Sequence, residues 1–213
     1  MISDRLGMHS VTGGLYNFLG RMAYFQNDYD QAEPLLEKGI DMCRAAEHHF
    51  HVAFGLTYLG LVRARRGQPD QGQRLCLASL DIFNDIGEPY GQALALDHLG
   101  QVTWLAGDNE LSKRYYLKAL QTSLEIGTMP QTLSAMVGLA PHLTLTGHIE
   151  QAAQLLAYAI QHPAGGYNTG QSARRLLAEM GVQSKAEPDA VAPSDEQVEK
   201  AARGLVLSQY KTL

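Results

Sequence analysis

Clusters of positive charge are missing from this 213-residue chain, and so are long apolar runs. Its 17 basic and 22 acidic residues give a formal net charge of −5, and the densest basic stretch is only Arg63, Arg65 and Arg66. Nucleic-acid-binding surfaces depend on clustered lysines and arginines, so direct binding of nucleic acid is not expected. No apolar run approaches the roughly 18 residues that span a bilayer, and the first ten residues hold no apolar segment of the secretion-signal type. We therefore expect a cytoplasmic protein without membrane contact.

Cysteine is scarce as well, with Cys43 and Cys76 as the two in the chain. Each lies at an apolar-side helical position, which predicts buried thiols and argues against a disulfide. His48, His49 and His51 come close together. They have no cysteine nearby and no second histidine at helical i+4 spacing, so we expect a turn and no metal site.

Catalytic signatures are also absent from the sequence. The glycine pairs Gly13-Gly14 and Gly165-Gly166 do not lead into the Gly-Lys-Ser/Thr of a phosphate-binding loop. No Ser-His-Asp set and no paired carboxylates stand out above chance spacing. The sequence therefore predicts a protein that is not an enzyme and that carries no cofactor.

What the chain does contain is a Leu-Gly pair that returns every 40 positions, together with three further columns at the same interval. Four columns in one register over four copies indicate a repeat protein. The columns are Leu19-Gly20, Leu59-Gly60, Leu99-Gly100 and Leu139-Ala140; Asn27, Gly67, Gly107 and Gly147; Ala32, Gly72, Ser112 and Ala152; and Ile40, Leu80, Leu120 and Ile160.

Each 40-residue unit divides into two predicted helices. Gly67 should end the first, because glycine adopts the left-handed conformation without a Cβ penalty, and Asn27 is the other residue type that does so readily. Asp28 and Asp108 are suited to cap the second helix, which should stop at Gly87 in the second unit. In each Leu-Gly pair we expect leucine to fill the space between the paired helices. Glycine should let the neighbouring helix backbone approach, and the small column should do the same from the other helix.

This pattern of columns over about residues 11–162 resembles the tetratricopeptide repeat (TPR) family, in a longer-helix variety with 40 rather than 34 residues per unit. The resemblance implies an all-α fold, a right-handed superhelix of four antiparallel helix pairs at about 11–47, 48–87, 88–127 and 128–162. There are two departures. The aromatic residue expected three positions before the leucine is present only as Tyr16, and Pro141 should kink or shorten the first helix of the fourth unit.

The register also makes predictions for the N-terminus. It places residues 1–10 at the end of an incomplete preceding repeat, and hence predicts that the chain is the C-terminal piece of a longer protein. The matching residues lie eighty positions apart, with Ile2, Asp4, Leu6 and Gly7 against Ile82, Asn84, Ile86 and Gly87.

Residues 163–213 should form a C-terminal region of loop, short helix, flexible linker and last helix. The short helix is expected over about 171–180, and the linker over 184–194. Ser194 and Gln197 form a capping box for the last helix. This ending, with His162-Pro163 and Arg-Arg-Leu-Leu-Ala-Glu at 174–179, is similar to the C-termini of bacterial signal-transduction ATPases (STAND) and LuxR-type regulators. In those proteins TPR arrays follow a nucleotide-binding module.

In TPR proteins the first helix of each unit lines a concave groove that binds ligands. The mixture of aromatic and polar groups at these positions suits a peptide, with Trp104 as an anchor. The alternative is that Tyr24, Tyr58 and Trp104 pack against the next repeat. The family's carboxylate clamp is not reproduced, because Asp97 and Gln101 occupy its positions. The resemblance implies these groove residues: Asn17, Arg21, Tyr24, Thr57, Tyr58, Leu61, Arg65, Asp97, His98, Gln101 and Trp104.

These expectations favour a non-catalytic scaffold that binds a protein or peptide, as the sensor or interaction arm of a larger bacterial signalling or transcriptional regulator. Two alternatives stay open. One is a sensor of a small molecule or peptide pheromone, with a pocket between the repeats and the C-terminal helices. The other is a module that associates with a second copy of itself through the incomplete N-terminal repeat.

Overall fold

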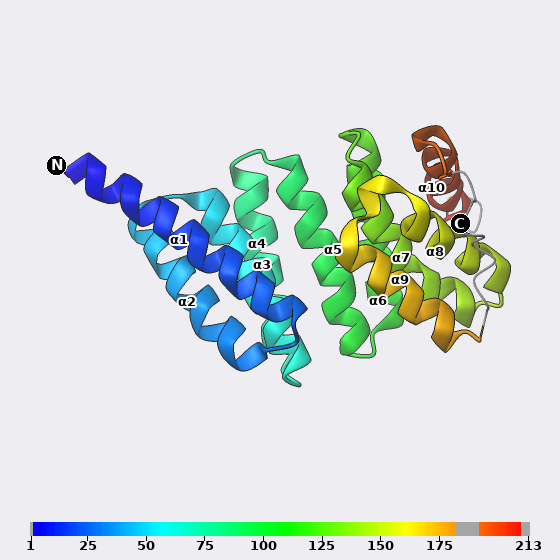
Figure 1. Ribbon diagram of the computed structural model, residues 1–213, viewed down its shortest axis with the longest axis horizontal. Coiled ribbons are helices and arrows are strands. Elements are labelled where there is room, and N and C mark those ends of the chain that lie inside the picture. The colour runs from blue at the N-terminus through cyan, green and yellow to red at the C-terminus, as the bar shows by residue number, and fades with distance from the viewer. Residues whose placement is uncertain (1, 182–191, 210–213) are drawn as a thin grey trace. The chain divides into compact units, whose positions relative to one another are not determined.

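The computed structural model describes residues 2–181 and 192–209 (Figure 1). Every regular element in these ranges is a helix, and no strand occurs among them, which confirms the all-α prediction. The elements are α1 (Ile2–Phe25), α2 (Tyr29–Ala45), α3 (His49–Arg65), α4 (Pro69–Asp85), α5 (Pro89–Leu105), α6 (Asn109–Glu125), α7 (Met129–Leu145), α8 (Ile149–Gln161), the 3-10 turn η1 (Pro163–Gly165), α9 (Gly166–Glu179) and α10 (Asp195–Gln209).

The helices follow one another at a constant interval. From α2 to α8, each begins 20 residues after the one before it, at positions 29, 49, 69, 89, 109, 129 and 149. Three residues separate each helix from the next in this range. Two helices and two linkers therefore make up the 40-residue period that the sequence showed.

The seven linkers between α1 and α8 all use the same turn. At the first, the Asn27 N–H donates to the Tyr24 carbonyl and the Asp28 N–H to the Ala23 carbonyl, both at 2.9 Å. This pair of bonds is the Schellman motif, which satisfies carbonyls at the end of a helix and needs a left-handed residue at its centre. These central residues have φ between 53° and 84°, and they are Asn27, Glu47, Gly67, Gly87, Gly107, Gly127 and Gly147.

The chain divides into two compact units, Met1–Ser112 and Lys113–Leu213. In the first unit, α1, α3 and α5 contact one another in succession, and α2 and α4 each pack against two of them. Phe83 of α4 is fully buried in a cluster with Ala53 of α3 and Ala95 of α5. In the second unit, α7 packs against α8, α9 and α10, and α8 also packs against α9.

The structure places two glycines of the repeat pattern at a direct contact between α3 and α4. A Cβ atom added to Gly60 would lie 2.5 Å from Cys76 Sγ and 2.8 Å from the Gly72 carbonyl oxygen. A Cβ added to Gly72 would lie 2.5 Å from the Gly60 carbonyl oxygen. The two backbones therefore approach closely at this point, and no side chain fits between them.

The leucines of the same pattern are not equivalent. Leu59, Leu99 and Leu139 are buried, whereas half of Leu19 is exposed. The expectation that each leucine fills the space between helices is therefore wrong for Leu19. The physical reason is that α2 packs against α3, whereas α1 is the first helix and no earlier described helix covers it.

The N-terminal boundary also differs from the prediction. The register predicted a helix end at Gly7, but α1 runs unbroken from Ile2 to Phe25. Gly87 and Gly127 are followed within three residues by a proline that suits a helix start, whereas Met8 and His9 follow Gly7 and allow the helix to continue. That the chain is a piece of a longer protein stays a prediction.

The C-terminal region shows three further outcomes. Pro141 does not shorten α7, which continues to Leu145. The short helix begins at Gly166, five residues before the predicted start, while most of the predicted linker lies outside the described residues. The capping box is confirmed, since the Ser194 N–H donates to Gln197 Oε1 at 2.9 Å and the Gln197 N–H to Ser194 Oγ at 3.3 Å.

Candidate functional site

Predicted groove residues from α1, α3 and α5 come together in the first unit. The rings of Tyr24 and Tyr58 lie 6.3 Å apart, and the rings of Tyr58 and His98 lie 4.9 Å apart. The Tyr24 hydroxyl donates to Gln101 Oε1 at 3.5 Å. Three successive first helices thus contribute to one group of side chains, which we call the inner-helix cluster: Arg21, Tyr24, Tyr58, Arg65, Asp97, His98 and Gln101.

Arg21 is held by aromatic rings. Its guanidinium carbon lies 5.5, 5.8 and 5.9 Å from the ring centroids of Phe18, Phe25 and Tyr58. Cation–π contacts of this kind are worth about 0.5–1 kcal/mol at exposed sites and more where water is excluded. The charge of Arg21 is therefore fixed in place beside the tyrosines.

Burial controls the protonation of the cluster. It lowers the pKa of His98 to about 3, because the imidazolium would lose its hydration, and the positive charge of Arg21 adds to this effect. Burial raises the pKa of Tyr58 and of Tyr24, and Arg65 partly offsets the rise for Tyr24. At neutral pH, His98 and both tyrosines are therefore uncharged.

The cluster has a buried layer and an accessible layer. Tyr24, Tyr58 and His98 are buried. The two tyrosines thus pack against neighbouring repeats, as the alternative interpretation of the sequence held. The accessible layer consists of the half-buried side chains Arg21, Arg65, Asp97 and Gln101, of which Arg21 Nε and Asp97 Oδ1 are buried atoms. Trp104, outside the cluster, is half-buried as well.

Besides Tyr24, Tyr58 and His98, three further predicted groove residues are buried. Asn17 is fully buried, and its Nδ2 donates to the His51 carbonyl at 2.8 Å. The Thr57 hydroxyl donates to the Ala53 carbonyl at 2.9 Å and also contacts Ser79 of α4. Leu61 is buried as well. These side chains lie in the packing between helices, and the groove positions implied by the resemblance are corrected accordingly.

The aromatic rings that pack around Tyr58 were not predicted from the sequence. Phe54 lies 4.9 Å from Tyr58 and Phe25 lies 6.2 Å from it, measured between ring centroids. The sequence does contain a signal for Phe54. Phe50, Phe54 and Tyr58 follow each other at the i, i+4 spacing of one helix face.

Two of the three neighbouring histidines, His48 and His51, contact each other at the start of α3. The Nδ1 atom of His48 accepts from the His51 N–H at 3.4 Å, which caps the start of α3, and the two rings stack at 4.3 Å. Among the described residues, no group of three or more His, Cys, Asp or Glu side chains could hold a metal ion. Both cysteines are buried free thiols, as predicted.

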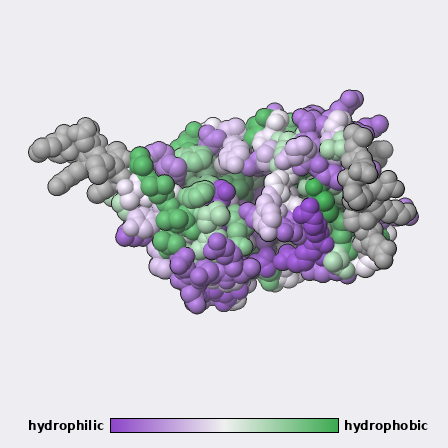
Figure 2. All heavy atoms as spheres, in the orientation of Figure 1, coloured by the Kyte–Doolittle hydropathy of each residue, from purple (hydrophilic) through white to green (hydrophobic). Residues whose placement is uncertain are grey.

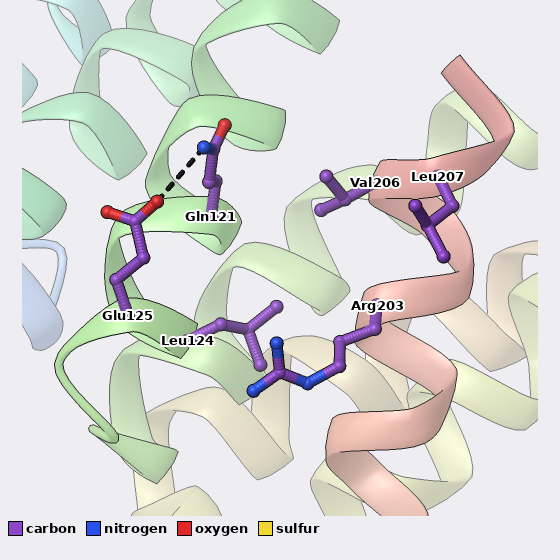
Figure 3. Close-up of a pocket in the computed structure, with 6 residues that line it drawn as sticks. All are labelled: Gln121, Leu124, Glu125, Arg203, Val206 and Leu207. Carbon is purple, nitrogen blue, oxygen red and sulfur yellow. Dashed lines mark hydrogen bonds between the residues drawn. The ribbon is translucent and has the colours of Figure 1, made fainter. Parts of the chain in front are cut away.

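The second unit contains a hollow of about 240 Å³ between α6 and α10 (Figure 3). On the α6 side, Gln121 Nε2 donates to Glu125 Oε1 at 3.0 Å, and on the α10 side Leu207 is largely exposed, so the hollow opens to solvent. Its lining combines apolar and charged groups: Gln121, Leu124, Glu125, Arg203, Val206 and Leu207.

The start of α10 is held by a buried histidine. His162 Nδ1 accepts from the Ala164 N–H at 3.1 Å, so Nε2 carries the proton and donates to Asp195 Oδ1 at 2.8 Å. Val198 and Ala202 then bury one face of α10. These contacts place α10 beside the hollow.

None of the described helices is long and apolar enough to cross a membrane.

Comparison with known proteins bears on the residues of the cluster. Two family models described as tetratricopeptide repeat match the chain, one over residues 12–51 and the other over residues 52–125. No curated protein sequence matches the chain. The two matches adjoin, cover more than half of the chain and include every member of the inner-helix cluster. Repeats of this kind generally serve as scaffolds for protein interactions. The chain belongs to the tetratricopeptide repeat family.

Proposed function

We propose that this protein is a non-catalytic scaffold that binds a protein or peptide across α1, α3 and α5. The observation that carries the proposal is the accessible layer of the inner-helix cluster. Arg21, Arg65 and Gln101 come from α1, α3 and α5; Arg21 lies against the buried ring of Tyr58, and Arg65 and Gln101 interact with the hydroxyl of Tyr24. Side chains fixed in this way lose little conformational entropy when a partner binds.

The chemistry of the layer fits an extended peptide with at least one acidic side chain. Arg65 can pair with a carboxylate in two parallel hydrogen bonds, which lysine cannot do. Gln101 has both a donor and an acceptor for a peptide group. Trp104, half-buried at the end of α5, supplies apolar area for an anchor residue of the partner.

A peptide-display selection followed by fluorescence polarisation tests the proposal. For the selected peptide, Arg65→Ala and Gln101→Ala should each weaken binding about tenfold or more, the effect of a contact worth roughly 1.4 kcal/mol. The matched controls are Arg74→Ala and Gln71→Ala, which remove the same side-chain types from exposed positions of α4. Unchanged affinity in both cluster variants would contradict the proposal.

We also propose the context that the sequence suggested, a cytoplasmic sensor or interaction arm of a larger bacterial signalling or transcriptional regulator. Its support is the similarity of the C-terminal ending to STAND and LuxR-type regulators. Sequencing the gene upstream of Met1 tests this directly, and an open reading frame without a nucleotide-binding or DNA-binding module would count against it.

The hollow between α6 and α10 favours one second candidate, a sensor of small amphipathic molecules. A thermal-shift screen of metabolites should then yield a ligand that raises the melting temperature. Leu124→Trp fills the hollow and should abolish that shift, while Tyr167→Trp, at an exposed site on α9, should leave it intact. A shift that survives Leu124→Trp would place the ligand elsewhere.

A further inference from the structure

One face of α1 exposes a row of large apolar side chains. Between 38% and 66% of each is accessible, and Figure 2 shows hydrophobic residues gathered over this helix. We call this row the α1 stripe: Val11, Leu15, Phe18, Leu19 and Met22.

The stripe has the spacing of a helix–helix contact. Val11, Leu15, Phe18 and Met22 are separated by four, three and four residues, which is the pattern of a coiled-coil seam. The buried residues of α1 lie on the opposite side, where Gly13 and Gly20 face α2. The helix is therefore apolar on two faces, and only one of them is covered.

Other exposed apolar residues do not form a comparable row. Among the described residues, those outside α1 lie in the linkers or near helix ends and do not follow one helix face, and scattered exposed apolar side chains are ordinary. They are Ile86, Tyr90, Leu105, Ile126, Leu145, Ile149, Tyr167 and Leu207.

The next repeat shows what kind of element covers this face. The positions 40 residues after Leu15, Phe18 and Met22 are Gly55, Tyr58 and Val62, and all three are buried. Helix α2 packs against this face at Gly55, where an added Cβ would lie 2.6 Å from Ile40 Cγ1, while Tyr58 contacts side chains of α1 and α5. The surface that the α1 stripe presents is thus one that a helix covers in the following copy.

The charge and the exposed area of the α1 stripe indicate which partner could cover it. Between residues 10 and 25, Arg21 is the one charged side chain, and it is held on aromatic rings, so two copies of this face can meet without like-charge repulsion. With a full area of about 200 Å² per large side chain, the exposed fractions amount to roughly 500 Å². Two such faces supply at most about 1,000 Å², which is the lower limit expected of a specific interface.

We propose that two copies of this chain associate through the α1 stripe, with α1 of one copy packed against α1 of the other. The contact is isologous, because each copy contributes the same face. The stripe and the inner-helix cluster meet at Phe18, whose ring lies against Arg21, so the proposal is tested at Leu15.

Light scattering after size-exclusion chromatography tests the proposal on the whole chain. At tens of micromolar, the wild-type protein should have twice the 23.3 kDa mass of one chain. Leu15→Glu should be monomeric at the same concentration, because it places a charge in the centre of the apolar contact. The matched control is Leu207→Glu, which adds the same charge at an equally exposed leucine of α10 and should stay dimeric.

A charge-swap experiment distinguishes a lost interface from a lost fold. An equimolar mixture of Leu15→Glu and Leu15→Lys chains should form a dimer again, because the two charges attract across the contact. Circular dichroism of each variant should match wild type. A monomeric wild-type chain, or a dimer that persists in Leu15→Glu, would overturn the proposal. Arg65→Ala should stay dimeric and Leu15→Glu should keep peptide binding, so each proposal can fail alone.

Discussion

At the scale of single residues, Glu47 occupies a backbone conformation that costs free energy. Its φ is 53°, in the left-handed region, where an L-residue with a Cβ is disfavoured by about 1–2 kcal/mol. Asparagine or glycine stands at the equivalent position of the other six linkers. The side chain of Glu47 is exposed, so nothing in its packing offsets the strain.

Glu47→Gly should therefore raise the free energy of unfolding by about 1 kcal/mol, part of which is lost to the greater freedom of glycine in the unfolded chain. Urea denaturation measures it. Gly67→Ala is the reciprocal control, since it introduces a Cβ at φ 80° and should lower stability. A destabilising Glu47→Gly would show that the side chain makes a contact that outweighs the strain.

His98 gives the stability of the first unit a pH dependence. Its pKa is about 3 in the folded protein and near 6.5 when unfolded, so between these values only the unfolded state binds the proton. Stability is therefore complete above about pH 6.5 and decreases as the pH falls, by at most about 1.4 kcal/mol per pH unit.

His98→Gln should flatten this dependence, whatever its effect on stability at pH 7. Urea denaturation of the variant and of wild type at pH 7, 6, 5 and 4 compares the slopes. His49→Gln, at an exposed histidine, should keep the wild-type slope. Equal slopes for wild type and His98→Gln would mean that His98 is accessible to protons in the folded state.

The sequence predicted which first-helix residues would meet, but not how deeply each lies. Tyr24, Tyr58 and His98 converge because the repeat register places them on α1, α3 and α5. Asn17 and Thr57 were assigned to the same surface, yet both face neighbouring helices. Burial depends on the rotation of each helix about its axis, which a register of columns does not contain.

At the scale of helices, the contact between α3 and α4 depends on the absence of side chains at Gly60 and Gly72. Gly60→Ala should lower the free energy of unfolding by about 1–3 kcal/mol, because the new methyl group would overlap Cys76 and the Gly72 backbone. Thermal unfolding followed by circular dichroism measures the loss.

Gly204→Ala is the matched control for this prediction. Gly204 also lies inside a helix, but an added Cβ would meet no atom within 4 Å. Alanine is favoured over glycine there by about 0.5–1 kcal/mol, so the control should be neutral or stabilising. A Gly60→Ala protein as stable as wild type would mean that α3 and α4 can separate at no cost.

Helix ends were predictable where a left-handed glycine or asparagine marked them, as at Asn27 and Gly67. Glu47 gave no such signal, because the backbone there is set by the uniform linker and not by the preference of the residue. Gly7 and Gly166 show the converse. Gly7 lies within α1 and Gly166 begins α9, so a glycine alone does not decide a boundary.

At the scale of the whole molecule, the two compact units should respond to mutation separately. Gly60 and Gly138 each lie at a close contact between helices, Gly60 against α4 and Gly138 against the ring of Tyr116 of α6. Repeat arrays are stabilised by contacts between neighbours, so a defect should act most strongly within its own unit.

Hydrogen exchange measured by mass spectrometry distinguishes a response within one unit from a response of both units together. Gly60→Ala should speed exchange mainly in α3 and α4, and Gly138→Ala mainly in α6 and α7. The unmutated unit in each protein serves as the internal control. Equally faster hydrogen exchange in all helices of both variants would show that the described helices unfold in a single cooperative transition.

The constant linker has a consequence for how such a gene can change in length. Recombination between two linkers that lie 40 codons apart removes or duplicates one complete helix pair, and both new junctions keep the three-residue turn with its left-handed centre. Recombination over 20 codons would also preserve the turn. It would, however, exchange the first for the second helix of a unit and so place charged faces such as that of α4 in the interior. Selection would then retain changes in steps of 40 codons, so the array can be lengthened or shortened without new junctions having to evolve.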